Sequence, residues 1–183
     1  MRYLIITVCA FALFFPVASN IYGQEEAGEV DQLAMYRSYA GQWDSVTETT
    51  VINGEGKEEF KTKGRWVQQD ILDGAMIEVK GSGERDGEPY KYMLLYGYDA
   101  SVEKHICWFY DQHGANSKMQ GEWSEEDKTM TWKLVDEEPE GFSVTIVDDL
   151  SDPDQIRFTF NLRSEDGQFA VTEAGSATRA RKQ

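Results

Sequence analysis

The sequence predicts an all-β protein, an up-and-down antiparallel barrel of about ten strands with one short N-terminal helix. From residue 42 onward, alternating runs of about seven to ten residues are separated by turns rich in Gly, Asp and Asn. Every connection is short, so strands that follow one another pair antiparallel. Because an open ten-stranded sheet would leave two unpaired edges, we expect the sheet to close on itself.

Residues 1–23 are typical of a secretory signal peptide. Arg2 is followed by an uncharged run from Tyr3 to Val17, which is shorter than the ~20 apolar residues of a membrane-spanning helix. Cleavage after Ser19 or after Gly23 fits the pattern. We therefore expect export, to the periplasm or the cell exterior, with residues 24–30 as a flexible leader and residues 31–183 as a single barrel domain.

The composition is strongly acidic, with 33 Asp and Glu against 18 Lys and Arg and a net charge of −15. Such a surface repels nucleic acid and anionic membrane headgroups, so neither is expected as a partner. Cys107 is the only cysteine after residue 23, which excludes an intrachain disulfide in the exported part. We expect a monomer or a weak homodimer.

The segment DQLAMYRSYAG, residues 31–41, predicts the helix. Leu33, Tyr36 and Ala40 recur at spacings of three and four, Asp31 is a candidate N-cap, and Gly41 is the expected end.

The strands follow as ten alternating segments. They are predicted at 42–52, 58–69, 75–84, 89–98, 104–111, 115–123, 129–136, 142–149, 155–163 and 168–178. The segment 89–98 is apolar on both faces, with Tyr92 and Tyr96 on one and Met93 and Leu95 on the other. Its outer face is therefore expected to pack under the helix or against a partner chain.

Gly41-Gln42-Trp43, at the start of the first strand, resembles the G-x-W signature of lipocalins and related calycin barrels. The resemblance implies that Trp43 closes one end of the barrel and that an Arg of the last strand, Arg179 or Arg181, packs over it as a cation–π pair.

A wider pattern adds YGYD at 96–99, an aromatic strand that ends at Asp111, a turn at Gly114 and TRAR at 178–181. Together with the helix and G-x-W, it resembles a bacterial family described as a domain of unknown function, with a lipocalin-like or nitrobindin-like barrel. The resemblance implies an interior cavity but no settled activity. Nitrobindin-type barrels bind haem through a histidine late in the chain, and none follows His113 here. No cofactor is expected.

Both histidines lie in GYDASVEKHICWFYDQHG, residues 97–114. His105, Cys107 and Asp111 share one face of a strand, which fits a structural wall, a metal site or a reactive thiol. A zinc site needs three or four ligands, and neighbours two apart on a strand stand nearly 7 Å apart, so the structural interpretation is favoured and no metal is expected.

Acidic residues offer further candidates. Asp148, Asp149, Asp152 and Asp154 surround Pro153 and indicate a solvated turn rather than a calcium loop. Glu78, Glu122 and Glu173 lie on predicted strands and could enter a cavity. The sequence does not pair them, so no catalytic residues are assigned.

The function that these patterns favour is binding of a small, mostly apolar ligand inside the barrel. The expected lining residues are Trp66, Tyr92, Tyr98, His105, Trp108 and Trp132. Two alternatives stay open: an enzyme that acts on such a ligand through cavity carboxylates or His105, and an interaction module with a filled interior and an exposed aromatic patch. Catalysis is less favoured than binding.

Overall fold

A computed structural model describes residues 31–85, 87–135 and 141–180. These residues form a closed barrel of ten antiparallel strands in the order β1-β10-β9-β8-β7-β6-β5-β4-β3-β2, which confirms the predicted fold. The predictions for residues 1–30 and for Arg181 lie outside the described residues. No helix in the described part of the chain has the length and apolar character needed to cross a membrane.

The strand boundaries lie close to those that the alternation predicts. The elements are α1 (Ala34–Arg37), β1 (Gly41–Asn53), β2 (Gly56–Ile71), the 3-10 turn η1 (Leu72–Gly74), β3 (Met76–Arg85), β4 (Glu88–Asp99), β5 (Lys104–Asp111), β6 (Asn116–Ser124), β7 (Thr129–Leu134), β8 (Phe142–Asp152), β9 (Gln155–Ser164) and β10 (Ala170–Arg179).

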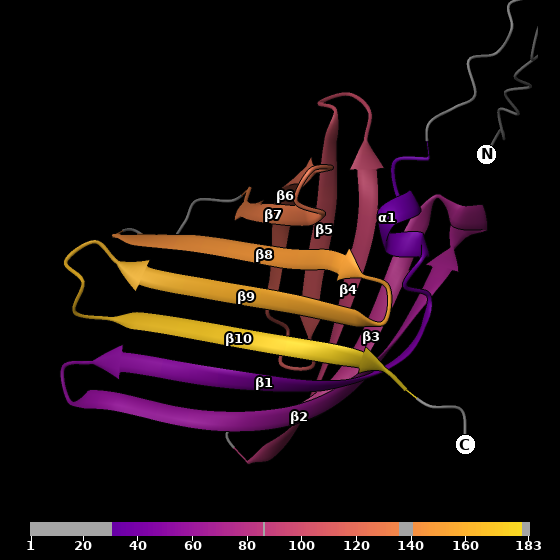
Figure 1. Cartoon of the computed structure of the whole chain (residues 1–183). Coiled ribbons are helices and arrows are strands. Elements are labelled where there is room, and N and C mark those ends of the chain that lie inside the picture. The colour runs from indigo at the N-terminus through magenta and orange to yellow at the C-terminus, as the bar shows by residue number, and fades with distance from the viewer. Residues whose placement is uncertain (1–30, 86, 136–140, 181–183) are drawn as a thin grey trace, which may run out of the picture. The chain divides into compact units, whose positions relative to one another are not determined.

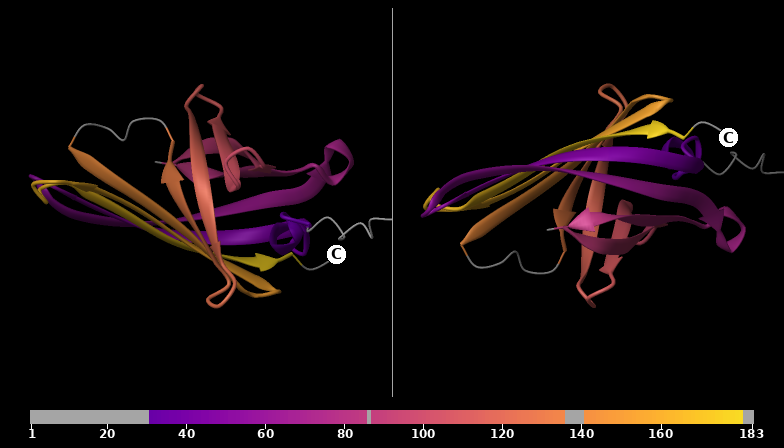
Figure 2. Two further views of the ribbon diagram at one scale, coloured as in Figure 1. Left: turned by 90° about the horizontal axis from the view of Figure 1, so that it is seen from above. Right: turned by 90° about the horizontal axis from the view of Figure 1, so that it is seen from below.

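The barrel has two different ends. Strands β8, β9, β10, β1 and β2 lie side by side with alternating direction, and β4 and β5 run at a steep angle to them (Figure 1). Helix α1 lies at the end where β1 begins, which we call the closed end, and the β1–β2 and β9–β10 hairpins lie at the other, the far end (Figure 2). The strong twist that separates the two strand directions is what closes a sheet into a barrel.

Alternation along each strand decides which side chains face the interior. Trp43 of β1 lies opposite Trp66 of β2 and opposite Arg179 of β10, and Tyr96 of β4 lies opposite Cys107 of β5. Near α1 these inward positions are tightly packed: Trp43, Met130 and Trp132 are at most 2% exposed. The closed end therefore holds the densest part of the core.

Helix α1 is shorter than predicted, with only four residues, and Leu33 rather than Asp31 is its N-cap. The Asp31 carboxylate instead accepts a hydrogen bond from the Leu33 N–H at 3.1 Å and pairs with Arg37 at 2.9 Å. The helix ends early because the chain must place Tyr36 and Tyr39 in the core, both 4% exposed, before β1 begins at Gly41.

Arg179 packs over the Trp43 ring where β1 and β10 pair. The Arg179 guanidinium carbon lies 4.5 Å from the centre of the Trp43 ring, and its Nη1 donates to the Ala40 carbonyl at 2.8 Å. The Trp43 indole N–H donates to the Tyr39 carbonyl at 2.9 Å, and the Tyr39 hydroxyl donates to the Leu150 carbonyl at 2.6 Å. The last strand, the helix and β8 are thereby joined at one point.

Candidate functional site

Several inward-facing side chains towards the far end keep part of their surface exposed. These aromatic and aliphatic residues are only partly buried: Tyr92, Leu94, Phe109, Ile146, Phe158, Phe160 and Leu162. Thr49 and Val144 in the same half are buried, at 4% and 7% exposed. A barrel filled by its own side chains would exclude water from such residues. This part of the barrel therefore offers an apolar wall to whatever enters.

Two of these rings lie flat against the wall because glycines stand behind them. A Cβ added to Gly81 would lie 2.0 Å from the Tyr92 ring, and one added to Gly175 would lie 2.0 Å from the Phe158 ring. No other residue type fits such a close approach. The absence of a side chain on the wall keeps both rings away from the centre of the barrel.

Three aromatic rings at the closed end form the bottom of this space, and we call them the aromatic floor: Tyr36, Tyr96 and Trp132. Tyr36 and Tyr96 stack with their ring centres 4.4 Å apart, and Trp132 lies 6.3 Å from Tyr36 and 5.6 Å from Tyr96. Each is at most 8% exposed. Rings in mutual contact hold one another in place, so the floor is a rigid surface.

Asp148 of β8 lies at the aromatic floor, and the expectation that it belongs to a solvated turn is wrong. It faces the interior opposite Phe158 of β9 and Met130 of β7. Its Oδ2 accepts hydrogen bonds from the Tyr36 hydroxyl at 3.0 Å and from the Trp132 indole N–H at 2.8 Å. Burial raises the pKa of this carboxyl, and the two hydrogen bonds oppose the rise.

The second oxygen of Asp148, Oδ1, has no hydrogen-bond donor among the described residues. In that part of the chain, the fully buried polar side-chain atoms without a partner are Trp66 Nε1 and His105 Nδ1. Asp148 as a residue is partly buried. This acceptor was not predicted from the sequence, although Phe142, Val144 and Ile146 set the parity that places Asp148 inside.

His105 and Cys107 face the interior, and both are almost completely buried, at 7% and 1% exposed. Burial lowers the pKa of His105 and raises that of the Cys107 thiol, so both groups are kept uncharged. His105 makes an edge contact with Tyr98, with ring centres 5.2 Å apart. Within residues 31–85, 87–135 and 141–180, no three His, Cys, Asp or Glu side chains are grouped to hold a metal ion.

The predicted lining residues fall into three groups. Trp66 and Tyr92 face the interior, and the Trp66 ring lies 6.5 Å from the Phe158 ring across it. Tyr98, His105 and Trp132 also face inward but belong to the closed end. Trp108 does not line the interior, because it has the opposite parity from Cys107.

Trp108 lies instead on the outer face of β5. A Cβ on Gly97 would be 3.5 Å from its ring, and Lys118 Nζ lies 5.9 Å from the ring centre. Trp108, Met76 and Ile106 border an outer hollow of about 440 Å³, and Ile106 is only 1% exposed. The apolar outer residues of this wall thus pack on one another, which accounts for the two-faced pattern of the sequence.

Two of the three candidate glutamates face outward. Glu78 pairs with Lys80 at 2.8 Å and Glu122 pairs with Lys104 at 2.7 Å. These hydrogen-bonded ion pairs lower the pKa of each carboxyl. Glu173 faces inward, opposite Thr49 and Phe160.

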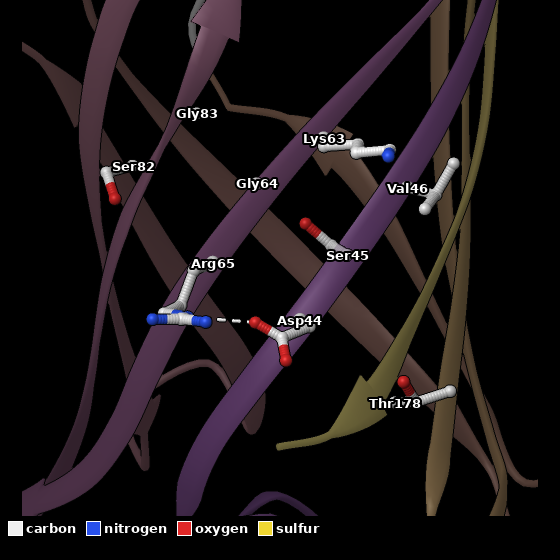
Figure 3. Close-up of a pocket in the computed structure, with 9 residues that line it drawn as sticks. All are labelled: Asp44, Ser45, Val46, Lys63, Gly64, Arg65, Ser82, Gly83 and Thr178. Carbon is white, nitrogen blue, oxygen red and sulfur yellow. Dashed lines mark hydrogen bonds and ion pairs between the residues drawn. The ribbon is translucent and has the colours of Figure 1, made fainter. Parts of the chain in front are cut away.

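A second outer hollow, of about 580 Å³, lies over β1, β2 and β3 (Figure 3). Its lining includes Ser45, Gly64 and Gly83 as well as the outward-facing Asp44 and Arg65. Arg65 donates to the Asp44 carboxylate at 2.8 Å, and both side chains are at least half exposed. The charges of Arg65 and Asp44 already neutralise each other and are exposed to water. This hollow is therefore a weaker candidate for ligand binding than the interior.

Residues 31–179 match the model of a family described as "Protein of unknown function (DUF1579)". The chain belongs to this family. A search of curated proteins found no match for this DUF1579 protein.

Solved structures with the same fold share little sequence with this DUF1579 protein. The S-type phycobiliprotein lyase from Guillardia theta has a TM-score of 0.54 and 11% identity, over 82% of this chain and 93% of the lyase. A DUF3598-family protein of unknown function from Nostoc punctiforme has a TM-score of 0.52 and 11% identity, over 78% of this chain and 48% of the other. At this identity the likeness shows the barrel fold alone.

Proposed function

We propose that the protein binds a small, mostly apolar ligand inside the barrel, between the aromatic floor and the far end. The observation that carries the proposal is the partial exposure of the inward-facing aromatic and aliphatic side chains in this half. Removing their surface from water is favourable by roughly 25 cal/mol per Å². A ligand that covers them gains this free energy without unfolding any element.

The geometry of the walls supports the proposal. The Tyr92 and Phe158 rings lie against Gly81 and Gly175, and Trp66 contributes a further ring from β2. The three rings come from β4, β9 and β2, and the two glycines from β3 and β10. Closed-barrel pairing holds these strands in place, so the wall is formed before a ligand arrives. Preformed apolar walls with few polar groups are characteristic of small-molecule sites.

The two other hypotheses have less support. An enzyme that uses His105 needs a second polar group in contact, and the His105 ring makes no hydrogen bond with the described residues. An interaction module with a filled interior is less favoured, because several inward-facing apolar side chains keep exposed surface. The outer face around Trp108 is apolar, but its residues largely bury one another.

Nile red, a neutral apolar dye, tests the proposal. We expect its fluorescence to rise on mixing with the protein and the replacement Leu94→Trp, which fills the interior, to weaken binding by about tenfold or more. Met93→Trp is the matched control, since Met93 precedes Leu94 and faces outward. Absence of dye binding to the wild-type protein, or an equal loss in both variants, would overturn the proposal.

A further inference from the structure

We propose that the ligand carries a basic nitrogen and that Asp148 is its anchor, with the aromatic floor around the cation. This inference rests on the proposed function and names the chemical class of its ligand: an apolar body with a protonated amine.

Asp148 has one oxygen that accepts no hydrogen bond from the described residues. Its Oδ2 accepts from Tyr36 and Trp132, whereas Oδ1 has no donor in that part of the chain, and the residue is only partly buried. A cation beside the carboxyl favours its ionised form, which only accepts hydrogen bonds. A ligand group that meets Oδ1 must therefore donate, and a charged donor gives the strongest such bond.

Aromatic rings surround the Asp148 carboxylate. Tyr36 and Trp132 touch it directly, and Tyr96 stacks on Tyr36 at 4.4 Å. The faces of aromatic rings attract cations, most strongly where water is partly excluded. A carboxylate beside three such rings favours an ammonium group over a neutral hydroxyl, because the rings add attraction only for the charged donor.

The charged side chains at inward-facing positions also bear on the charge of the ligand. Asp148 places a carboxylate at an inward-facing position of β8, and Asp111 places a second one at the end of β5, where it also accepts from the His113 and Ala115 N–H groups at 2.9 Å. Among inward-facing side chains that the structure describes, the one Lys or Arg is Arg179, which is held at the closed end by Trp43 and the Ala40 carbonyl. These carboxylates repel an anionic ligand and attract a cationic one. The net charge of −15 on the whole chain adds to both effects.

Three probes that share one naphthalene ring test the inference by calorimetry: 1-naphthylmethylamine, 1-naphthalenemethanol and 1-naphthoic acid. We expect the amine to bind the wild-type protein at least about tenfold more tightly than the alcohol, and the acid to bind most weakly. Equal affinity for all three would overturn the amine inference and leave the proposed function standing, whereas a wild-type protein that does not bind Nile red would overturn the proposed function itself.

Two variants locate the anchor. Asp148→Asn keeps an oxygen that accepts from Tyr36 and Trp132 but removes the charge, so we expect the preference for the amine to disappear. Asp149→Asn is the matched control, because Asp149 faces outward and pairs with Arg157 at 3.3 Å. Far-ultraviolet circular dichroism checks that both variants fold. A preference that survives in the folded Asp148→Asn protein, or that Asp149→Asn also abolishes, would overturn the assignment.

Discussion

The two ends of the barrel use the same strand alternation to build different interiors. At the closed end, inward positions carry large side chains such as Trp43 and Trp132, and Tyr36 of α1 and the flanking Leu33 and Tyr39 are each 4% exposed. Towards the far end, inward positions of β1 and β2 carry the smaller Thr47 and Thr62, and several inward-facing apolar residues of other strands keep exposed surface. Side-chain size and one short helix therefore decide which half is core and which half is available to a ligand.

The largest effect is expected from Trp43→Ala, which removes the central side chain of the closed end. Trp43 is 0% exposed, so the change creates a cavity. It also removes the hydrogen bond to the Tyr39 carbonyl and the cation–π contact with Arg179. We expect a loss of about 3–5 kcal/mol in the free energy of unfolding, measured by urea denaturation.

Phe60→Ala is the control at the far end, where Phe60 is 39% exposed. We expect a loss of at most about 1.5 kcal/mol, since much of this ring is already in water. Equal losses in the two variants would contradict the difference between the ends.

A smaller effect is expected from alanine at two inward glycines. A Cβ at Gly121 would lie 2.6 Å from the Trp132 ring and 2.7 Å from the Met130 sulfur, both fully buried, so Gly121→Ala should cost about 1–3 kcal/mol in thermal unfolding. Gly175→Ala should cost less stability but weaken Nile red binding, because Phe158 has room to swing into the interior. A Gly175→Ala protein that binds the dye like wild type would show that this part of the interior is not used.

The smallest effect is a pH dependence that Asp148 contributes to stability. Its pKa in the folded protein is raised above the ordinary 3.8, mainly by burial. The folded state therefore holds this proton more tightly than the unfolded state, and the resulting stabilisation is present below pH 3.8 and is lost as the pH rises through the raised pKa. Tyr36, Tyr96, Cys107 and Trp132 surround the group, and the first three are themselves uncharged at neutral pH because burial raises their pKa.

Asp148→Asn removes this contribution. We expect wild type to lose stability relative to Asp148→Asn as the pH is raised from about 4 to 7, in paired urea titrations that cancel the other ionisable groups. A constant difference over this range would mean that Asp148 titrates as it does in water.

The architecture could be predicted because it depends on local features. Turn residues and the period of two predicted all ten strands, and the resemblance to lipocalins implied that Trp43 and either Arg179 or Arg181 close one end. The length of α1 could not be predicted, because the helix ends where Tyr36 and Tyr39 enter the core, which is a tertiary requirement rather than a local preference.

The candidate site was harder to predict, because it depends on where strands end and which parity continues. The segment DDLSDPD has the composition of a turn, yet β8 extends to Asp152 through an irregular register between Asp149 and Asp152. Carrying the parity of Ile146 one step further identifies Asp148 as an inward residue. The same rule, applied to Cys107, separates Trp108 from the interior. Glu78 forms an ion pair with Lys80. Which carboxylates form such pairs could not be predicted, because the sequence does not give the register of neighbouring strands.

The pairing of β1 with β10 has a consequence for folding and synthesis. Trp43–Ile52 pair with Ala170–Arg179, and the Arg179 contact with Ala40 joins residues 139 positions apart. A chain emerging from the ribosome therefore presents β1 without its second neighbour until almost the whole domain has been made. Pairings so distant in sequence slow folding, and an unpaired edge invites association with other chains. Truncation within β10 should accordingly produce aggregation before it produces a merely destabilised monomer.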